Sequence, residues 1–308
     1  MTFQDVEKAR QTYYAKIKKQ TIITIVIVIV VIALFMLSGS GASSIFILFP
    51  IVFFITTFIT IISSFSNRKV FREYRHAYKG YFVEQNLKAI FSGLDYSHEM
   101  GLSSTPLDLT GIINTGDRFS SNDFTKGQYK NVDFCQADVH IETEYTDSDG
   151  DTHYTTIFRG RFMIFEFPKQ FKFRLALVGR HFRAFYKPGT NRANGRKMEK
   201  LSTESNEFNS AFRIYAEDGF EAYYILDPAF MVKLLDIDTH HKGNTIFCFN
   251  NNLLIIGIND GKDSFEPPKP YKPIDEAAEN AKVSSDIKMI TDLVDQLSLS
   301  RKCFKSNY

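Results

Sequence analysis

Two long apolar runs stand out near the start of the chain. Residues 22–37 and 45–62 contain no charged residue, and each extends through Thr, Ser or Gly to about 20 residues, enough to cross roughly 30 Å of hydrocarbon. The first run is rich in β-branched residues, but a lone strand cannot satisfy its backbone in lipid, so we expect helices. The uncharged segment 38–44 predicts a short turn. The pattern therefore predicts a transmembrane helical hairpin over 22–65, with spans at about 22–40 and 45–65.

Basic residues flank the predicted hairpin on both outer sides. They are Lys18, Lys19, Arg68, Lys69, Arg72 and Arg75. By the positive-inside rule, both termini should be cytoplasmic and only the turn outside. Contact of these residues with anionic lipid headgroups is one interpretation, and a role in setting topology alone is the other. A cleaved signal peptide is the alternative for the first run, although the second span that follows at once argues against it.

Beyond the hairpin the periodicity changes twice. Apolar positions from Phe71 to Ile90 recur at helical spacing and predict a helix over 66–91. From about 107 to 266 short alternating runs predict strands, beginning with a long hairpin whose polar tip lies at 147–151. The further strands expected are 171–178, 181–186, 212–216, 220–226, 244–249 and 253–258, with a turn at 250–252 between the last two.

Two helices are expected in the second half of the chain. Asp227 and Pro228 predict the capped start of a short helix over 227–236. After a proline-rich break, an amphipathic pattern predicts a helix over about 275–299, which would dock on its own domain or on a partner. The fold class is therefore α+β, with a mainly antiparallel β cytoplasmic domain. The segments expected are a basic N-terminus (1–21), the hairpin (22–65), a juxtamembrane helix (66–91), a β-rich domain (92–268) and the C-terminal break and helix (269–308).

The composition and charge of the chain limit which compartment and which class of partner we expect. The 308 residues are 44% hydrophobic with a net charge of +2, which excludes wholesale disorder. Residues 1–20 carry +3 and residues 66–80 carry +4, so the rest of the chain sums to −5. An acidic main domain argues against nucleic-acid binding. The cysteines Cys135, Cys248 and Cys303 are odd in number and lack motif spacing, as expected for free thiols in a reducing compartment.

Motifs for chemistry are missing from the sequence. The acidic run 147–151 lacks the glycine and the final glutamate of a calcium loop, which leaves a solvated hairpin tip. The seven histidines show no zinc spacing, and 189–197 has arginine where a phosphate-binding loop needs lysine. We therefore expect no catalytic residue, metal or cofactor. An enzyme with dispersed catalytic residues, such as His181 and Asp227, is the alternative, and Asp227 is also explained as a helix cap.

One basic segment is the best candidate site. Between 180 and 200 there are seven basic residues and one acid, a local charge of +6 inside the acidic domain. Such segregation favours binding of an anionic lipid or an acidic partner, whereas a solvated loop is the alternative. The residues are Arg180, Arg183, Lys187, Arg192, Arg196, Lys197 and Lys200.

Several segments resemble a bacterial family. These are 90–96 (IFSGLDY), 158–171 (FRGRFMIFEFPKQF), 212–235 (FRIYAEDGFEAYYILDPAFMVKLL) and 265–268 (FEPP). Together they resemble the membrane-associated domain-of-unknown-function 3137 family over roughly 70–268. The resemblance implies an N-terminal helical hairpin, a cytoplasmic β-rich domain, the bacterial cell membrane and a LemA-like membrane protein as partner. It assigns no residue a role.

The sequence thus predicts a non-enzymatic, membrane-anchored binding or scaffold module. Its partners would be the lipid bilayer together with a protein or anionic lipid. A membrane-tethered hydrolase or transferase is the alternative.

Overall fold

The computed structural model describes residues 1–37, 50, 54, 57–58, 67–186 and 198–297. The chain divides into two compact units. Unit 1 comprises Met1–Gln85 and Glu266–Ala281, and unit 2 comprises Asn86–Phe265 and Lys282–Tyr308. Two helices, α3 (Glu84–Ile90) and α8 (Glu276–Gln296), cross from one unit into the other.

Unit 1 is helical. Helix α1 (Phe3–Leu37) begins at a turn in which Asp5 accepts hydrogen bonds from Thr2. A second helix covers 67–78 and continues through a π-helical turn, η1 (Lys79–Val83), into α3. Aromatic rings join the two helices, with the Tyr13 and Phe71 centroids 5.3 Å apart. The unit is thus held by an aromatic contact between segments far apart in sequence.

The apolar runs are described only in part. Residues 22–37 belong to α1, and several of their Ile and Val side chains are exposed, among them Ile25 and Ile29. Most of the second run and the turn at 38–44 lie outside the described residues. Within the described residues, no helix meets the length and hydrophobicity needed to cross a membrane.

Unit 2 is built on one antiparallel sheet with the order β1-β2-β3-β4-β6-β5, and β7 pairs with β4. Its strands are β1 (Ser92–Ser97), β2 (Arg118–Tyr129), β3 (Val132–Thr146), β4 (Thr152–Gly179), β5 (Glu199–Leu201), β6 (Phe212–Ala216) and β7 (Thr245–Ile258). Its short helices are α4 (Thr105–Asp108), α5 (Asn206–Ala211), α6 (Gly219–Ile225) and α7 (Pro228–His240). The mixed α+β class with a mainly antiparallel sheet is confirmed.

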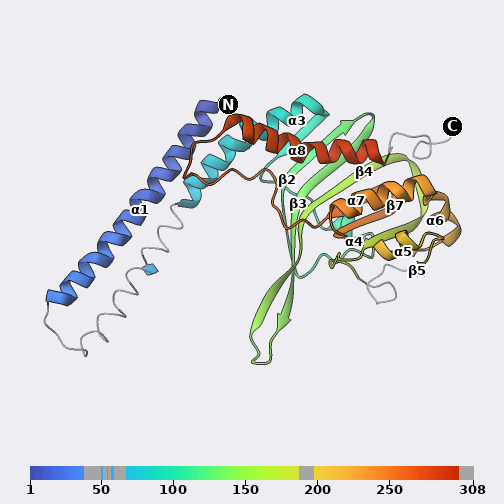
Figure 1. Ribbon diagram of the computed structural model, residues 1–308, viewed down its shortest axis with the longest axis horizontal. Coiled ribbons are helices and arrows are strands. Elements are labelled where there is room, and N and C mark those ends of the chain that lie inside the picture. The colour runs from blue at the N-terminus through green and yellow to red at the C-terminus, as the bar shows by residue number, and fades with distance from the viewer. Residues whose placement is uncertain (38–49, 51–53, 55–56, 59–66, 187–197, 298–308) are drawn as a thin grey trace. The chain divides into compact units, whose positions relative to one another are not determined.

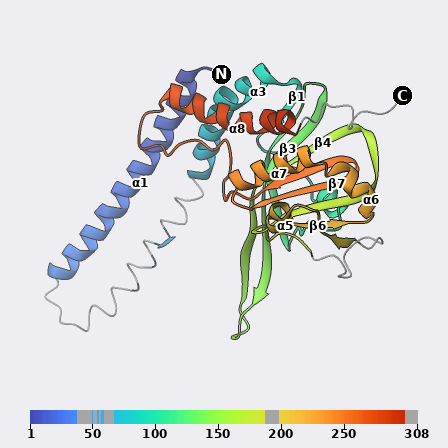
Figure 2. The ribbon, with the colours of Figure 1, turned by 45° about the vertical axis from the view of Figure 1, so that its right-hand side comes forward.

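The long strand β4 organises this sheet. Its first half pairs with β3 as the predicted hairpin, whose polar tip extends away from the rest of unit 2 (Figure 1). On its other edge β4 pairs with β7 from Arg161 to Val178, and its last residues pair with β6. Helix α7 lies beside β7 in both ribbon views (Figure 2). One face of the sheet holds the core, in which the rings of Phe158 and Phe162 stack 4.4 Å apart. The opposite face of β4 is buried as well, because Met163 and Phe165, which alternate with the core residues Phe162 and Ile164, are also inaccessible to solvent.

Two expected strands and one expected turn are wrong. The segment 220–226 is mostly helix α6, because Asp218 caps it by accepting hydrogen bonds from the N–H groups of Phe220 and Glu221. The segment 181–186 is a turn with one bridge residue, Phe185. The two strands expected around 250–252 are one strand, β7, whose register shifts near Asn251. The positive φ of Asn251 (53°) makes a bulge there rather than a chain reversal.

The expected helices of the second half are present. In α7 the Asp227 carboxylate accepts a hydrogen bond from the Phe230 N–H at 2.9 Å, as predicted for a cap. In α8 the residues Val283, Ile287, Ile290, Leu293 and Val294 are buried. The part of α8 in unit 2 lies on its own domain, since Asp286 O accepts a hydrogen bond from Arg161.

Candidate functional site: an arginine-lined pocket

A tight loop after β4 forms one wall of a pocket in unit 2. The loop leaves the strand at Gly179, where a Cβ atom would come within 2.6 Å of Gly243 O and 2.7 Å of the Asp238 carboxylate. Only glycine fits there. The N–H of His181 then donates to Gly243 O at 2.8 Å, and Phe182 is buried beside Phe158 with ring centroids 5.8 Å apart. These contacts fix the backbone of the neighbouring residues.

The turns that flank β7 form the opposite wall. Between α7 and β7, Lys242 and Gly243 adopt positive φ, and the Asp238 carboxylate accepts a hydrogen bond from the Thr245 hydroxyl. After β7, Asn259 Oδ1 accepts a hydrogen bond from the Arg159 N–H at 3.1 Å. The side chain of Asn259 thus ties this wall to β4.

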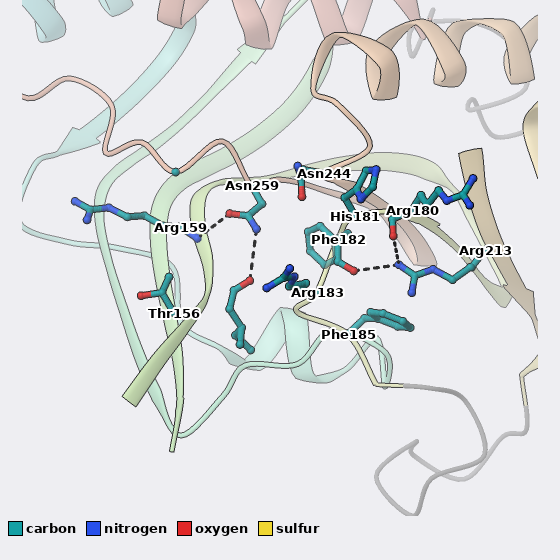
Figure 3. Close-up of a pocket in the computed structure, with 12 residues that line it drawn as sticks. Thr156, Arg159, Arg180, His181, Phe182, Arg183, Phe185, Arg213, Asn244 and Asn259 are labelled. Carbon is teal, nitrogen blue, oxygen red and sulfur yellow. Dashed lines mark hydrogen bonds between the residues drawn. The ribbon is translucent and has the colours of Figure 1, made fainter. Parts of the chain in front are cut away.

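Four arginines line the resulting pocket, which we call the arginine pocket. They are Arg159 from β4, Arg180 and Arg183 from the loop, and Arg213 from β6 (Figure 3). The open cavity has a volume of about 890 Å³, within the range of small-molecule sites. Among the twelve described residues that line it, none is acidic.

Arg213 links the strand to the loop. Its Nη2 donates hydrogen bonds to the carbonyl oxygens of Gly179 at 2.7 Å and Phe182 at 3.0 Å. Its guanidinium lies over the Phe185 ring at 4.2 Å from the centroid. Burial lowers the pKa of Arg213 from its ordinary value, and its Nε has no hydrogen-bond partner within the described part of the chain. The positive charge of Arg213 is therefore partly desolvated.

The other three arginines are exposed to solvent. Arg180 and Arg183 pair with no carboxylate among the described residues. Arg159 lies 4.0 Å from the Asp263 carboxylate, at the outer limit of an ion pair. Positive charge in the pocket thus exceeds the negative charge around it, which suits an anionic ligand.

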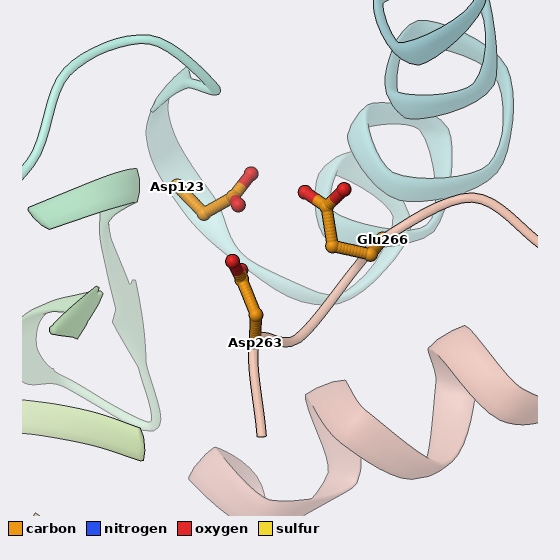
Figure 4. Close-up of side chains that lie close together, drawn as sticks. All are labelled: Asp123, Asp263 and Glu266. Atoms are coloured by element: carbon orange, nitrogen blue, oxygen red, sulfur yellow. The ribbon is translucent and has the colours of Figure 1, made fainter. Parts of the chain in front are cut away.

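A second polar cluster lies buried in unit 2. Asp138 and Arg161 face each other across β3 and β4, and their closest ion-pair atoms are 3.6 Å apart. Burial raises the pKa of Asp138 to about 7, although the Arg161 guanidinium acts in the opposite direction. Nearby, the Asn122 amide donates hydrogen bonds to Asp123 at 2.7 Å and to Asp263 at 3.3 Å, and these two carboxylates are drawn in Figure 4. The like charges of Asp123 and Asp263 add to the rise in the Asp138 pKa, and Arg161 is the cation that opposes it.

The predicted basic residues fall into separate places. Arg180 and Arg183 line the arginine pocket, whereas Lys200 is exposed on β5 and is not part of its lining. Four lie outside the described residues: Lys187, Arg192, Arg196 and Lys197. Of the juxtamembrane set, Lys18, Lys19, Arg68, Lys69 and Arg72 are exposed on helices of unit 1. Arg75 donates from Nε to Glu266 at 2.8 Å.

Sequence reasoning missed Arg159 and Arg213. Both lie in segments with a strand pattern, in which a single charged residue is normally interpreted as facing solvent. A signal was present in 212–216 (FRIYA), where an arginine stands among apolar and aromatic residues. The two candidate catalytic residues of the alternative hypothesis have different places in the structure: His181 lines the pocket, whereas Asp227 caps α7. Burial raises the pKa of the Cys135 thiol to about 11, and also that of Cys248, so both are structural at neutral pH.

Comparison with models of known protein families finds a match in the second half of the chain. Residues 156–299 match the model of the family described as protein of unknown function (DUF3137). The suspected resemblance is confirmed. We call these residues the DUF3137 segment. The DUF3137 segment begins in β4 and ends after α8, and it includes all four arginines of the pocket.

The chain was also compared with curated proteins and with solved structures. A search of curated proteins finds no match to the sequence. Among solved structures, the crystal structure of the mycobacterial trehalose monomycolate transport factor A is similar to this chain with a TM-score of 0.36 and 10% sequence identity. The alignment covers 72% of this chain and 94% of that chain.

Proposed function

We propose that this protein is a non-enzymatic, membrane-anchored module that binds an anionic ligand in the arginine pocket. The observation that carries the proposal is that Arg159, Arg180, Arg183 and Arg213, from three segments, line one cavity in which no described lining residue is acidic. Guanidinium groups are effectively always charged and pair strongly with oxyanions. A cavity lined by several guanidinium groups therefore suits an anionic ligand.

The binding proposal is supported by the difference between the buried arginines of unit 2, which have carboxylate partners, and the exposed ones. Arg174 pairs with Glu217 at 2.6 Å, and Arg161 faces Asp138. Arg180 and Arg183 have no such partner among the described residues. The fold therefore supplies carboxylates to Arg161 and Arg174, whereas Arg180 and Arg183 are available to pair with an anionic ligand.

Membrane anchoring is a separate part of the proposal. It is supported by the uncharged runs 22–37 and 45–62, by the basic residues that flank them, and by the exposed Ile and Val side chains of α1. Alkaline extraction of cell membranes tests it directly. Retention of the full-length protein in the pellet is expected, and its release to the supernatant would contradict anchoring.

Calorimetric titration of the full-length protein with inorganic pyrophosphate tests the binding proposal. We expect saturable binding that the double variant R180Q/R183Q loses. The matched control is R118Q, which removes one exposed arginine of β2 that is not part of the pocket lining. Equal binding by wild type and R180Q/R183Q would refute the arginine pocket as the site.

A further inference from the structure

We infer that the arginine pocket binds a ligand with two phosphate groups on one organic body, as in a sugar bisphosphate or the headgroup of a diphosphatidyl lipid. The inference rests on the proposed function and goes further by naming the class of ligand. It depends on how the arginines are distributed, on their chemical type, and on what lies between them.

The arginines are spread along the pocket rather than gathered at one point. Arg159 lies at one end, on the β4 side, and Arg180 and Arg213 lie at the other, with Arg183 between them (Figure 3). A single small anion can touch only one part of this arrangement. Anionic groups at both ends of the ligand would place a counter-charge near each set of guanidinium groups.

The chemical type of the lining favours phosphate. Among the described residues that line the pocket, the basic ones other than His181 are all arginines. The planar guanidinium fork pairs bidentately with phosphate and carboxylate oxygens. The forks start from different elements: β4, the loop after it, and β6. A tetrahedral phosphate accepts hydrogen bonds from several directions, whereas a planar carboxylate accepts them mostly in one plane.

The middle of the pocket favours an organic connection between the charges. Ile157, Phe182 and Phe185 contribute to the lining, and Phe185 is held in place by the Arg213 guanidinium above its ring. The volume of about 890 Å³ also leaves room for more than inorganic phosphate. A sugar or glycerol body could lie against these side chains while its phosphates reach the arginines.

The test compares ligands by calorimetric titration of the full-length protein in detergent. The soluble probes are orthophosphate, a hexose bisphosphate and tetraglutamate. Mixed micelles containing cardiolipin or phosphatidylglycerol, matched in total phosphate, form the lipid arm. We expect the bisphosphate, free or as cardiolipin, to bind at least about tenfold more tightly than orthophosphate, phosphatidylglycerol or tetraglutamate.

Variants at the two ends of the pocket connect this preference to the structure. R159Q and R180Q should each weaken bisphosphate binding by about tenfold while orthophosphate binding changes less, and R118Q should change neither. A preference for the soluble compound or for cardiolipin identifies the source of the phosphates. Equal, pocket-dependent binding of orthophosphate or tetraglutamate would overturn the inference and leave the proposed function standing. No pocket-dependent binding of any probe would overturn both.

Discussion

The arginines of unit 2 occur in two contrasting environments. Arg161 and Arg174 are more than nine-tenths buried, and each faces a carboxylate, Asp138 and Glu217 respectively. Arg180 and Arg183 are exposed and have no carboxylate partner among the described residues. Buried charges must be compensated for the chain to fold, whereas exposed ones can be left for a ligand. This difference distinguishes the arginines that stabilise the fold from those that are available to bind a ligand.

Breaking the best-compensated pair should have the largest effect. Glu217 accepts hydrogen bonds from Arg174 Nε at 2.7 Å and from the Arg174 N–H at 3.0 Å. The substitution E217A would leave the buried guanidinium uncompensated, and we expect a loss of about 3–5 kcal/mol in the free energy of unfolding. Urea denaturation of the full-length protein measures it. A loss below about 1 kcal/mol would show that the pair matters little to the fold.

Arg213 belongs to both environments and should give an intermediate effect. Its hydrogen bonds to the Gly179 and Phe182 carbonyls hold the loop, while its side chain also lines the pocket. R213Q should lower the free energy of unfolding by about 2 kcal/mol, because charge-assisted hydrogen bonds to a half-buried group are lost. The same urea experiment measures this change. R213K would keep the charge but not the fork, so recovery of full stability in R213K would contradict this account.

The buried cluster predicts a dependence of stability on pH. The pKa of Asp138 is raised to about 7 in the folded protein, whereas an unfolded aspartate titrates near about 3.9. Between these values the folded state binds the extra proton, so stability should fall as pH rises from about 4 to about 7 and then level off. Urea denaturation across this range should show less of this slope in D138N than in wild type. An unchanged slope would exclude Asp138 as its source.

The smallest effect on folding is expected for the two exposed arginines of the loop after β4. R180Q and R183Q each remove an exposed charge that has no carboxylate partner among the described residues. Each should change the free energy of unfolding by less than about 0.5 kcal/mol, as measured by urea denaturation without ligand. A much larger loss would mean that these side chains support the fold, against the contrast drawn above.

Local patterns predicted the fold better than they predicted the pocket. The β3–β4 hairpin, β6 and the capped start of α7 follow from alternation and capping alone. The errors lie where tertiary contacts override propensity. The loop after Gly179 is set by a close approach to Gly243, and β7 continues through Asn251 because β4 pairs with both of its halves. Neither contact is visible in a local pattern.

The site could be predicted only where its residues are close in sequence. Arg180 and Arg183 belong to the basic segment at 180–200, and its charge pointed to them. Arg159 and Arg213 lie on different strands and are more than fifty residues apart along the chain, and only the sheet brings them to the same cavity. Charge counting in contiguous segments cannot find such a convergence.

Differential scanning calorimetry with and without a hexose bisphosphate tests the central contrast most directly. The full-length wild type and R180Q/R183Q are heated under identical conditions. Without ligand the two should unfold at the same temperature, because these arginines do not hold the fold. With ligand at about 100 times Kd, wild type should gain about 2.7 kcal/mol and unfold at a higher temperature, while the variant should not shift. An equal shift in both proteins, or a lower unfolding temperature of the variant without ligand, would contradict the account.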